Sequence, residues 1–254
     1  MAGIIAVANQ KGGVGKTATT ANLGAALARL GNRVLVVDMD PQGNLTASFG
    51  VHDQICGTIG KTLLDPKSQS PILSVRDGLE GHLHLLPERN ASLAEAEASL
   101  SNKLGKEFRL RDVLNDVGGR YDFILIDTPP SLGLLTVNSL VAASRVIVPT
   151  EARFFSLAGL KGLEETIDGV RYYNPGLKIL GILLSKLDRR LNEEKEVADY
   201  LREQWGELVF STEIGTNSKI LKAASSAQPL TEVQGGARAS ELYVELAKEV
   251  LARG

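Results

Sequence analysis

The residues between positions 10 and 17 combine the side chains and the spacing that phosphate binding requires. They read Gln10-Lys11-Gly12-Gly13-Val14-Gly15-Lys16-Thr17. Because glycine has no Cβ atom, consecutive backbone N–H groups in such a stretch can turn toward a single oxyanion. The ammonium group of Lys16 suits the β- and γ-phosphates of a nucleotide, and the hydroxyl of Thr17 suits a Mg²⁺ ion that keeps most of its water ligands. We therefore predict a phosphate-binding loop.

Two flanking segments must hold this loop in position. Residues 4–8 are short and apolar, which is typical of a buried strand, and residues 18–30 place apolar side chains at helical spacing before Gly31 ends the helix. A loop between a strand and a helix lies at the positive end of the helix dipole, where an anion is stabilised. The strict P-loop pattern has a glycine where this chain has Gln10, and Lys11 is an additional lysine. The alternative is a glycine-rich turn that binds nothing.

Three aspartates follow apolar segments that are typical of buried strands. Asp38 ends the segment 33–38 and Asp40 follows it by two positions, and Asp127 ends the segment 121–127. Ligands bind at the carboxyl ends of parallel strands, so we expect these acids near the loop. Asp38 and Asp40 are candidates for magnesium and water positioning, and Asp127 is expected to face the metal through water. The alternatives are a turn built on Asp and Pro, and an aspartate that caps the next helix.

The whole chain is consistent with one large domain. Its 254 residues are 43% hydrophobic, which is enough for a sizeable core. Apolar strands alternating with helices predict an α/β protein with the P-loop NTPase fold, in which a mostly parallel, twisted sheet carries helices on both faces. We expect a single domain over residues 1–254. The net charge of −2 gives no global basic field, so any contact with nucleic acid requires a local patch.

Further elements are expected from periodicity. The last of them, a helix over 238–251, has glutamates on its polar side, whereas a membrane-surface helix prefers lysine and arginine there. We expect this helix to pack against the core. Apolar runs are far shorter than the roughly 20 residues that a membrane span needs, and we expect no signal peptide before the first strand. The other expected strands cover 82–87, 145–150, 177–185 and 210–214, and the other expected helices cover 91–104, 108–117 and 157–172.

Three further features are weaker signals. Gly60-Lys61-Thr62 repeats the end of a phosphate loop, but no strand precedes it, so we expect a helix start or a loop. His82 and His84 share a strand face, and a solvated face is favoured over a metal site because no third ligand is near. The single cysteine, Cys56, excludes a disulfide framework within the chain and a cysteine zinc cluster, and it is typical of a reducing cytosol.

Residues 11–17 resemble the deviant Walker A motif of the ParA/MinD group of P-loop ATPases. Residues 38–43, which read Asp-Met-Asp-Pro-Gln-Gly, and 127–131, which read Asp-Thr-Pro-Pro-Ser, resemble the motifs that this group has after the corresponding strands. The resemblance to ParA and Soj proteins covers nearly the whole chain. It implies an ATPase that uses ATP and Mg²⁺ and forms an ATP-dependent homodimer.

The resemblance also implies roles for individual residues. Lys11 would reach the nucleotide of the partner subunit, Asp40 would position the attacking water, and Asp38 would help to hold the metal shell. The expected catalytic residues are Lys11, Lys16 and Asp40, and the expected metal residues are Thr17, Asp38 and Asp127. The expected nucleotide contacts are Lys11, Gly12, Gly13, Val14, Gly15, Lys16, Thr17, Ala18 and Asn217.

A DNA-binding surface is implied at two places. ParA and Soj proteins have an Asp-x-Arg after the strand that corresponds to 177–185, and Arg190 matches its arginine while Arg189 occupies the variable position. In the segment 214–229, Gly215-Thr216 replaces the Pro-Arg that relatives have, so adenine contacts and DNA contacts there differ in detail. The expected DNA-binding residues are Arg189, Arg190, Lys219 and Lys222. The alternative for the basic cluster is an ordinary solvated surface.

The function implied is chromosome or plasmid partition in the cytoplasm, on the nucleoid. The partners would be nonspecific double-stranded DNA and a ParB-type centromere-binding protein that speeds hydrolysis, with no membrane contact. An alternative is a MinD-like ATPase that positions other machinery on a membrane or at a cell pole. An iron–sulfur reductase like the nitrogenase iron protein has a similar loop, but a single cysteine leaves too few cluster ligands even in a dimer.

Overall fold

The computed structural model describes residues 2–76, 81–153, 156–216 and 237–254. Within these residues, eight strands form one sheet in the order β3-β4-β2-β5-β1-β6-β7-β8. Neighbouring strands are parallel except β3 and β4, which pair antiparallel at one edge. The strands are β1 Gly3–Val7, β2 Arg33–Asp38, β3 Leu73–Arg76, β4 His82–Leu86, β5 Phe123–Asp127, β6 Arg145–Glu151, β7 Lys178–Leu187 and β8 Ile214–Gly215.

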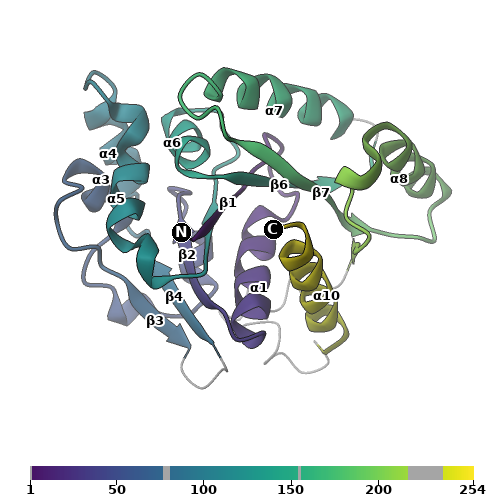
Figure 1. Cartoon of the computed structure of the whole chain (residues 1–254), viewed down its shortest axis with the longest axis horizontal. Coiled ribbons are helices and arrows are strands. Elements are labelled where there is room, and N and C mark those ends of the chain that lie inside the picture. The colour runs from purple at the N-terminus through teal and green to yellow at the C-terminus, as the bar shows by residue number, and fades with distance from the viewer. Residues whose placement is uncertain (1, 77–80, 154–155, 217–236) are drawn as a thin grey trace.

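Helices cover both faces of the sheet (Figure 1). They are α1 Lys16–Arg29, α2 Asn44–Ala47, α3 Ile59–Leu64, α4 Ser92–Leu100, α5 Arg109–Val117, α6 Leu134–Ala142, α7 Ser156–Val170, α8 Asn192–Trp205 and α10 Ala237–Arg253. Short 3-10 helices span His52–Gln54, Lys106–Phe108, Gly118–Arg120 and Gly206–Leu208. The predicted fold class, a mostly parallel sheet between helical layers, is therefore confirmed.

Successive side chains of a strand are buried in two different hydrophobic cores, one on each face of the sheet. In β2, Val34 and Val36 pack with α1, whereas Leu35 and Val37 pack with α3, α4 and α5 on the opposite face. This alternation is the normal consequence of a strand whose successive side chains point to opposite faces. Because both faces are buried, the interior residues of β2 are all apolar, from Val34 to Val37, which is why the strand was visible in the sequence.

The last helix packs against the core, as predicted. Tyr243, Leu246, Ala247 and Val250 of α10 are buried in the same cluster as Leu23 of α1, and α10 lies beside α1 in Figure 1. None of the helices in the described part of the chain has the length and apolar composition that crossing a membrane requires.

Some boundaries differ from the prediction. The strand expected over 210–214 is reduced to Ile214–Gly215, and Phe210 instead fills the space above Gly181 of β7, where a Cβ atom would lie 2.4 Å from the ring. The helix expected over 91–104 ends at Leu100. The edge strand β3 was not predicted. Its four residues pair on one side only, so neither length nor periodicity marks it.

The weaker sequence signals have structural explanations. Gly60-Lys61-Thr62 lies inside α3, as expected for a helix rather than a phosphate loop. His82 is exposed, and Nδ1 of His84 lies 2.8 Å from the hydroxyl of Tyr121, within hydrogen-bonding distance. No cluster of three or more metal-binding side chains occurs among the residues described.

Candidate active site

The carboxyl ends of three neighbouring strands converge on the phosphate loop. Parallel pairing sets Val7, at the end of β1, beside Asp127 at the end of β5, and it sets Asp38, at the end of β2, beside the same aspartate. The loop leaves β1 and enters α1, whose N-cap is Gly15. The sheet order therefore brings together the loop and the acids that the sequence placed at separate strand ends.

Two glycines of the loop require a backbone that other residues rarely adopt. Gly13 has φ +76° and Gly15 has φ +92°, both in the left-handed region. Lys16 is buried, and its Nζ donates a hydrogen bond of 3.3 Å to the carbonyl oxygen of Lys11 across the loop. Burial lowers the pKa of Lys16, and the charges of Asp127 and Asp40 oppose this shift. The loop thus has the backbone curvature and the cation that bind a phosphate.

Thr17 and Asp127 have the arrangement that a hydrated magnesium ion needs. The hydroxyl of Thr17 donates a 2.7 Å hydrogen bond to Oδ2 of Asp127. The other carboxylate oxygen, Oδ1, is buried and has no hydrogen-bond partner within the described part of the chain. Burial, and then the nearby Asp38, raise the pKa of Asp127 well above its usual range. An unsatisfied buried carboxylate is costly, and a metal ion with its waters would supply both the charge and the donors that are missing.

The two aspartates after β2 differ in what they contact. Oδ2 of Asp38 accepts hydrogen bonds from the backbone N–H of Thr46, at 2.8 Å, and from the Thr46 hydroxyl, at 2.7 Å. Burial raises the pKa of Asp38 to about 7. Asp40 instead lines the cavity beside the loop, with Oδ1 accepting from the N–H of Gln42 at 3.0 Å. Asp40 is therefore the aspartate of the two that faces space for a ligand.

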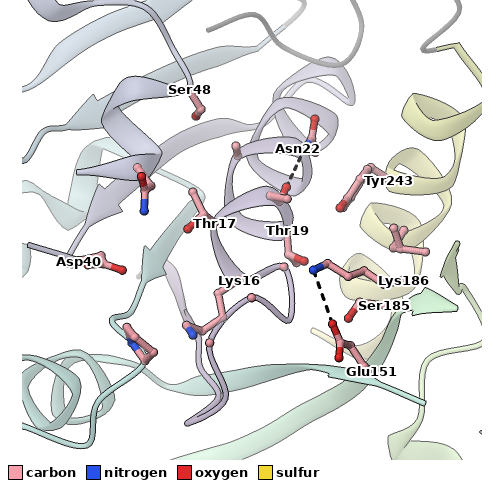
Figure 2. A pocket seen from close by; sticks show the side chains of 18 of the residues that line it. Lys16, Thr17, Thr19, Asn22, Asp40, Ser48, Glu151, Ser185, Lys186 and Tyr243 are labelled. Atoms are coloured by element: carbon pink, nitrogen blue, oxygen red, sulfur yellow. Dashed lines mark hydrogen bonds and ion pairs between the residues drawn. The ribbon is translucent and has the colours of Figure 1, made fainter. Parts of the chain in front are cut away.

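A cavity of about 920 Å³ lies against the loop. Figure 2 shows Thr17 and Asp40 on one side of the loop and Glu151, Ser185 and Lys186 on the other. The described residues that line the cavity include six of the expected nucleotide contacts, namely Gly12, Gly13, Gly15, Lys16, Thr17 and Ala18. Val14 is instead buried, and its carbonyl oxygen accepts a 2.7 Å hydrogen bond from Ser185.

Lys11 forms an ion pair within its own chain. Its Nζ lies 2.8 Å from Oε2 of Glu151, and Nζ of Lys186 lies 3.5 Å from the other oxygen, Oε1. Burial pushes the pKa of Glu151 upward, but the hydrogen bond from Lys11 and the charges of Lys11 and Lys186 together hold it below its ordinary value. The carboxylate is therefore ionised and shared by two lysines at the mouth of the loop.

The expected DNA-binding arginines lie after β7, and each contacts a carboxylate. Arg189 donates two hydrogen bonds of 2.7 Å to Glu213, and Arg190 binds Asp188, with its Nη2 2.6 Å from Oδ2. The side chain of Arg190 is 89% exposed. Asn217, Lys219 and Lys222 lie outside the described residues. The arginines are accessible, but their charges are partly balanced within the chain.

Sequence reasoning missed Glu151 and Lys186, which line the cavity from β6 and β7. Both lie at the carboxyl ends of strands that were predicted. The aspartates were predicted because they lie at the carboxyl ends of strands. The same criterion, applied to every predicted strand, would have identified Glu151 and Lys186.

Known proteins resemble this chain over its whole length. A family model described as an AAA domain matches residues 2–179. The chromosome partitioning protein ParA of Myxococcus xanthus is 40% identical, with 98% of this chain and 88% of the relative covered. The sporulation initiation inhibitor protein Soj of Bacillus subtilis is 39% identical, with 100% of both chains covered.

Solved structures agree with this comparison. Cobyrinic acid a,c-diamide synthase from Mycobacterium smegmatis, with a bound ATP analog and magnesium, has a TM-score of 0.82 and 36% identity, covering 99% of this chain and 95% of that one. The septum site-determining protein MinD from Pyrococcus horikoshii, complexed with Mg-ADP, has a TM-score of 0.79 and 25% identity, covering 99% and 98%.

Proposed function

Because this chain belongs to the ParA/Soj family of P-loop ATPases, we propose that it binds and hydrolyses Mg-ATP in order to segregate DNA. The observation that carries the proposal is the pairing of Thr17 with the buried Asp127, whose second oxygen lacks a partner among the described residues, directly beside the glycine loop. A chain that only needed a tight turn would gain nothing from this costly carboxylate.

Each residue of the site has a definite task in this proposal. The loop amides and Lys16 bind the phosphates, and Thr17 and Asp127 hold the metal, with Asp38 supporting that shell. Bound magnesium would neutralise charge on the phosphates. Asp40 lies at the cavity wall, where it can accept a hydrogen bond from a water molecule and orient it. Ala18 and Asn217 complete the proposed nucleotide contacts.

ATP would control DNA binding through dimerisation. We propose that ATP closes a homodimer in which Lys11 reaches the partner's nucleotide, and that hydrolysis separates the subunits. A dimer joins two patches of Arg189, Arg190, Lys219 and Lys222, so phosphate contacts multiply and nonspecific DNA affinity rises. A ParB-type protein would stimulate hydrolysis, as the family implies, and the protein would act on the nucleoid.

The chain contains the sequence Gly-Lys-Thr twice, once in the phosphate loop and once in α3. The decisive experiment compares the lysines of these two sequences. Lys16→Ala should abolish ATP turnover, because the phosphates lose their cation, whereas Lys61→Ala in α3 should leave turnover unchanged. Phosphate release with and without Mg²⁺ measures both variants, and thermal unfolding checks that each is folded. Equal turnover by wild type and Lys16→Ala would overturn the enzymatic proposal.

The MinD-like alternative would require ATP-dependent attachment to lipid or to a polar complex. The apolar side chains of α10 that would serve an amphipathic anchor are buried against α1. Sedimentation of the protein with vesicles in the presence of ATP distinguishes the two functions, since partition activity requires DNA binding rather than vesicle binding.

A further inference from the structure

Lys186 lies where a second cation could reach a nucleotide bound in the same subunit. Its side chain lines the cavity, and its Nζ lies 4.0 Å from the point that a Cβ atom on Gly13 would occupy. Figure 2 shows the side chain beside the loop, on the side opposite Asp40. We propose that Lys186 is a phosphate-binding residue of this site and that Glu151 holds it there until the nucleotide arrives. The inference rests on the proposed binding of ATP.

The backbone conformation at Lys186 directs its side chain toward the phosphate loop. Lys186 has φ +55°, a left-handed conformation that is uncommon for lysine and costs free energy. The register of β7 against β8 shifts between Ser185 and Leu187, so Lys186 lies at an irregularity of the ladder. Such irregularities commonly redirect a side chain at functional sites.

Hydrogen bonds hold this conformation from both sides. The hydroxyl of Thr216 donates to the carbonyl oxygen of Lys186 at 2.8 Å, and the hydroxyl of Ser185 donates to the carbonyl oxygen of Val14 at 2.7 Å. The second bond ties the end of β7 directly to the phosphate loop. The position of Lys186 relative to the loop is therefore set by two polar anchors rather than by a free loop.

Glu151 explains how the lysine is kept near the loop without a ligand. Its side chain is 12% exposed and lies within ion-pairing distance of both Lys11 and Lys186. The pair to Lys186 is the longer one, at 3.5 Å against 2.8 Å, so Lys186 is the more weakly held of the two. A phosphate group has more negative charge than a carboxylate and would compete for the ammonium group.

Binding of Mg-ADP, measured by calorimetry, tests the proposal, because ADP requires no γ-phosphate and no dimer. Lys186→Met should weaken ADP binding about tenfold, the usual cost of a charge-assisted hydrogen bond, whereas Lys186→Arg should stay within about threefold of wild type. The matched control is Lys178→Met, at the other end of β7. Adenosine, measured by its displacement of a fluorescent ADP, should bind wild type and Lys186→Met equally.

A second variant changes affinity in the opposite direction. Glu151→Gln keeps the shape of the side chain and removes a negative charge beside the phosphates, so ADP affinity should rise about threefold. Lys186→Met with unchanged ADP affinity, or with an equal loss for adenosine, would overturn the role of Lys186. Wild type that binds no ADP would instead defeat the proposed function, so the two failures are distinguishable.

Discussion

The carboxylates around the phosphate loop differ in how their charge is balanced. Glu151 is shared by two lysines, whereas Asp127 accepts a hydrogen bond from the hydroxyl of Thr17, and Asp38 accepts hydrogen bonds from Thr46 in α2. Burial raises the pKa of both aspartates. Asp127, which forms no ion pair within the described part of the chain, lies next to Thr17, where a divalent cation is expected. The contacts of each carboxylate, rather than its residue type, therefore distinguish the acid that pairs with lysines from the acid that we propose holds the metal.

The positive charge of Arg190, in the basic cluster after β7, is also balanced by a carboxylate, that of Asp188. Hydrogen bonds from Arg190 lower the pKa of Asp188 to about 2, so the pair is fully charged at pH 7, and its contribution to stability is lost as the pH falls from the ordinary pKa of an aspartate through about 2. Arg190→Ala should weaken ATP-dependent DNA binding for all sequences and reduce the slope of log affinity against log salt by about one. Asp188→Asn should strengthen binding, because Arg190 no longer has a competing carboxylate.

Fluorescence anisotropy with duplexes of unrelated sequence, at several salt concentrations, measures both variants. Arg171→Ala is the matched control, since Arg171 is also exposed and paired with an aspartate, Asp168. DNA affinity that does not respond to salt in the wild type would contradict a surface that contacts phosphates.

At the level of elements, α1 is positioned by its close approach to the sheet. A Cβ atom on Gly24 would lie 2.7 Å from Cγ1 of Val36 and 3.4 Å from Leu83. Only glycine allows the helix to lie this near to β2 and β4, and the helix N-terminus is thereby held over the carboxyl end of β1. The phosphate loop is therefore supported by packing that begins two turns away from it.

Gly24→Ala should destabilise the protein despite the higher helix propensity of alanine. The propensity gain is about 1 kcal/mol, and forcing a methyl group into a packed core costs about 1–3 kcal/mol, so we expect a net loss of about 1 kcal/mol. Gly169→Ala in α7 is the control, because among the described residues no atom beyond its own stretch of helix lies within 4 Å of the new methyl group, and the variant should be slightly more stable. Urea unfolding measures both. A stabilised Gly24→Ala would show that the helix can shift away at no cost.

On the scale of the whole molecule, the sheet order places the site at the middle of the fold. β1 lies between β5 and β6, so the loop has acids on one side and the ends of β6 and β7 on the other. Lys11 lies at this junction, paired with Glu151 of its own chain. For Lys11 to reach a partner subunit, as we propose, this ion pair must open when the dimer forms.

Lys11→Ala should therefore reduce dimerisation with ATP while leaving the monomer folded. Analytical ultracentrifugation with and without ATP should show that wild type shifts toward a dimer and that the variant shifts less. Lys61→Ala, whose lysine lies in α3, serves as the control. A wild-type protein that remains monomeric with ATP, or a variant that dimerises fully, would contradict the proposed crossing of Lys11.

Much of this fold is readable from local patterns. The β1 and β2 segments are almost entirely apolar because helices bury both faces, and the glycines of the loop are required by its left-handed backbone at Gly13 and Gly15. Short or irregular elements could not be predicted from the sequence. β3 has four residues paired on one side, and in the segment 210–214 only Ile214 belongs to a strand, while Phe210 is buried against Gly181.

The amino-acid sequence was sufficient to predict the phosphate loop, the strand-end aspartates and the family, since each of these depends on residues that are close together in the sequence. They did not show that Glu151 pairs with both Lys11 and Lys186, because those contacts join residues 140 and 35 positions apart. Strand order and the bulge at the end of β7 brought these groups together. Such long-range contacts arise from packing of whole elements, which local patterning does not encode.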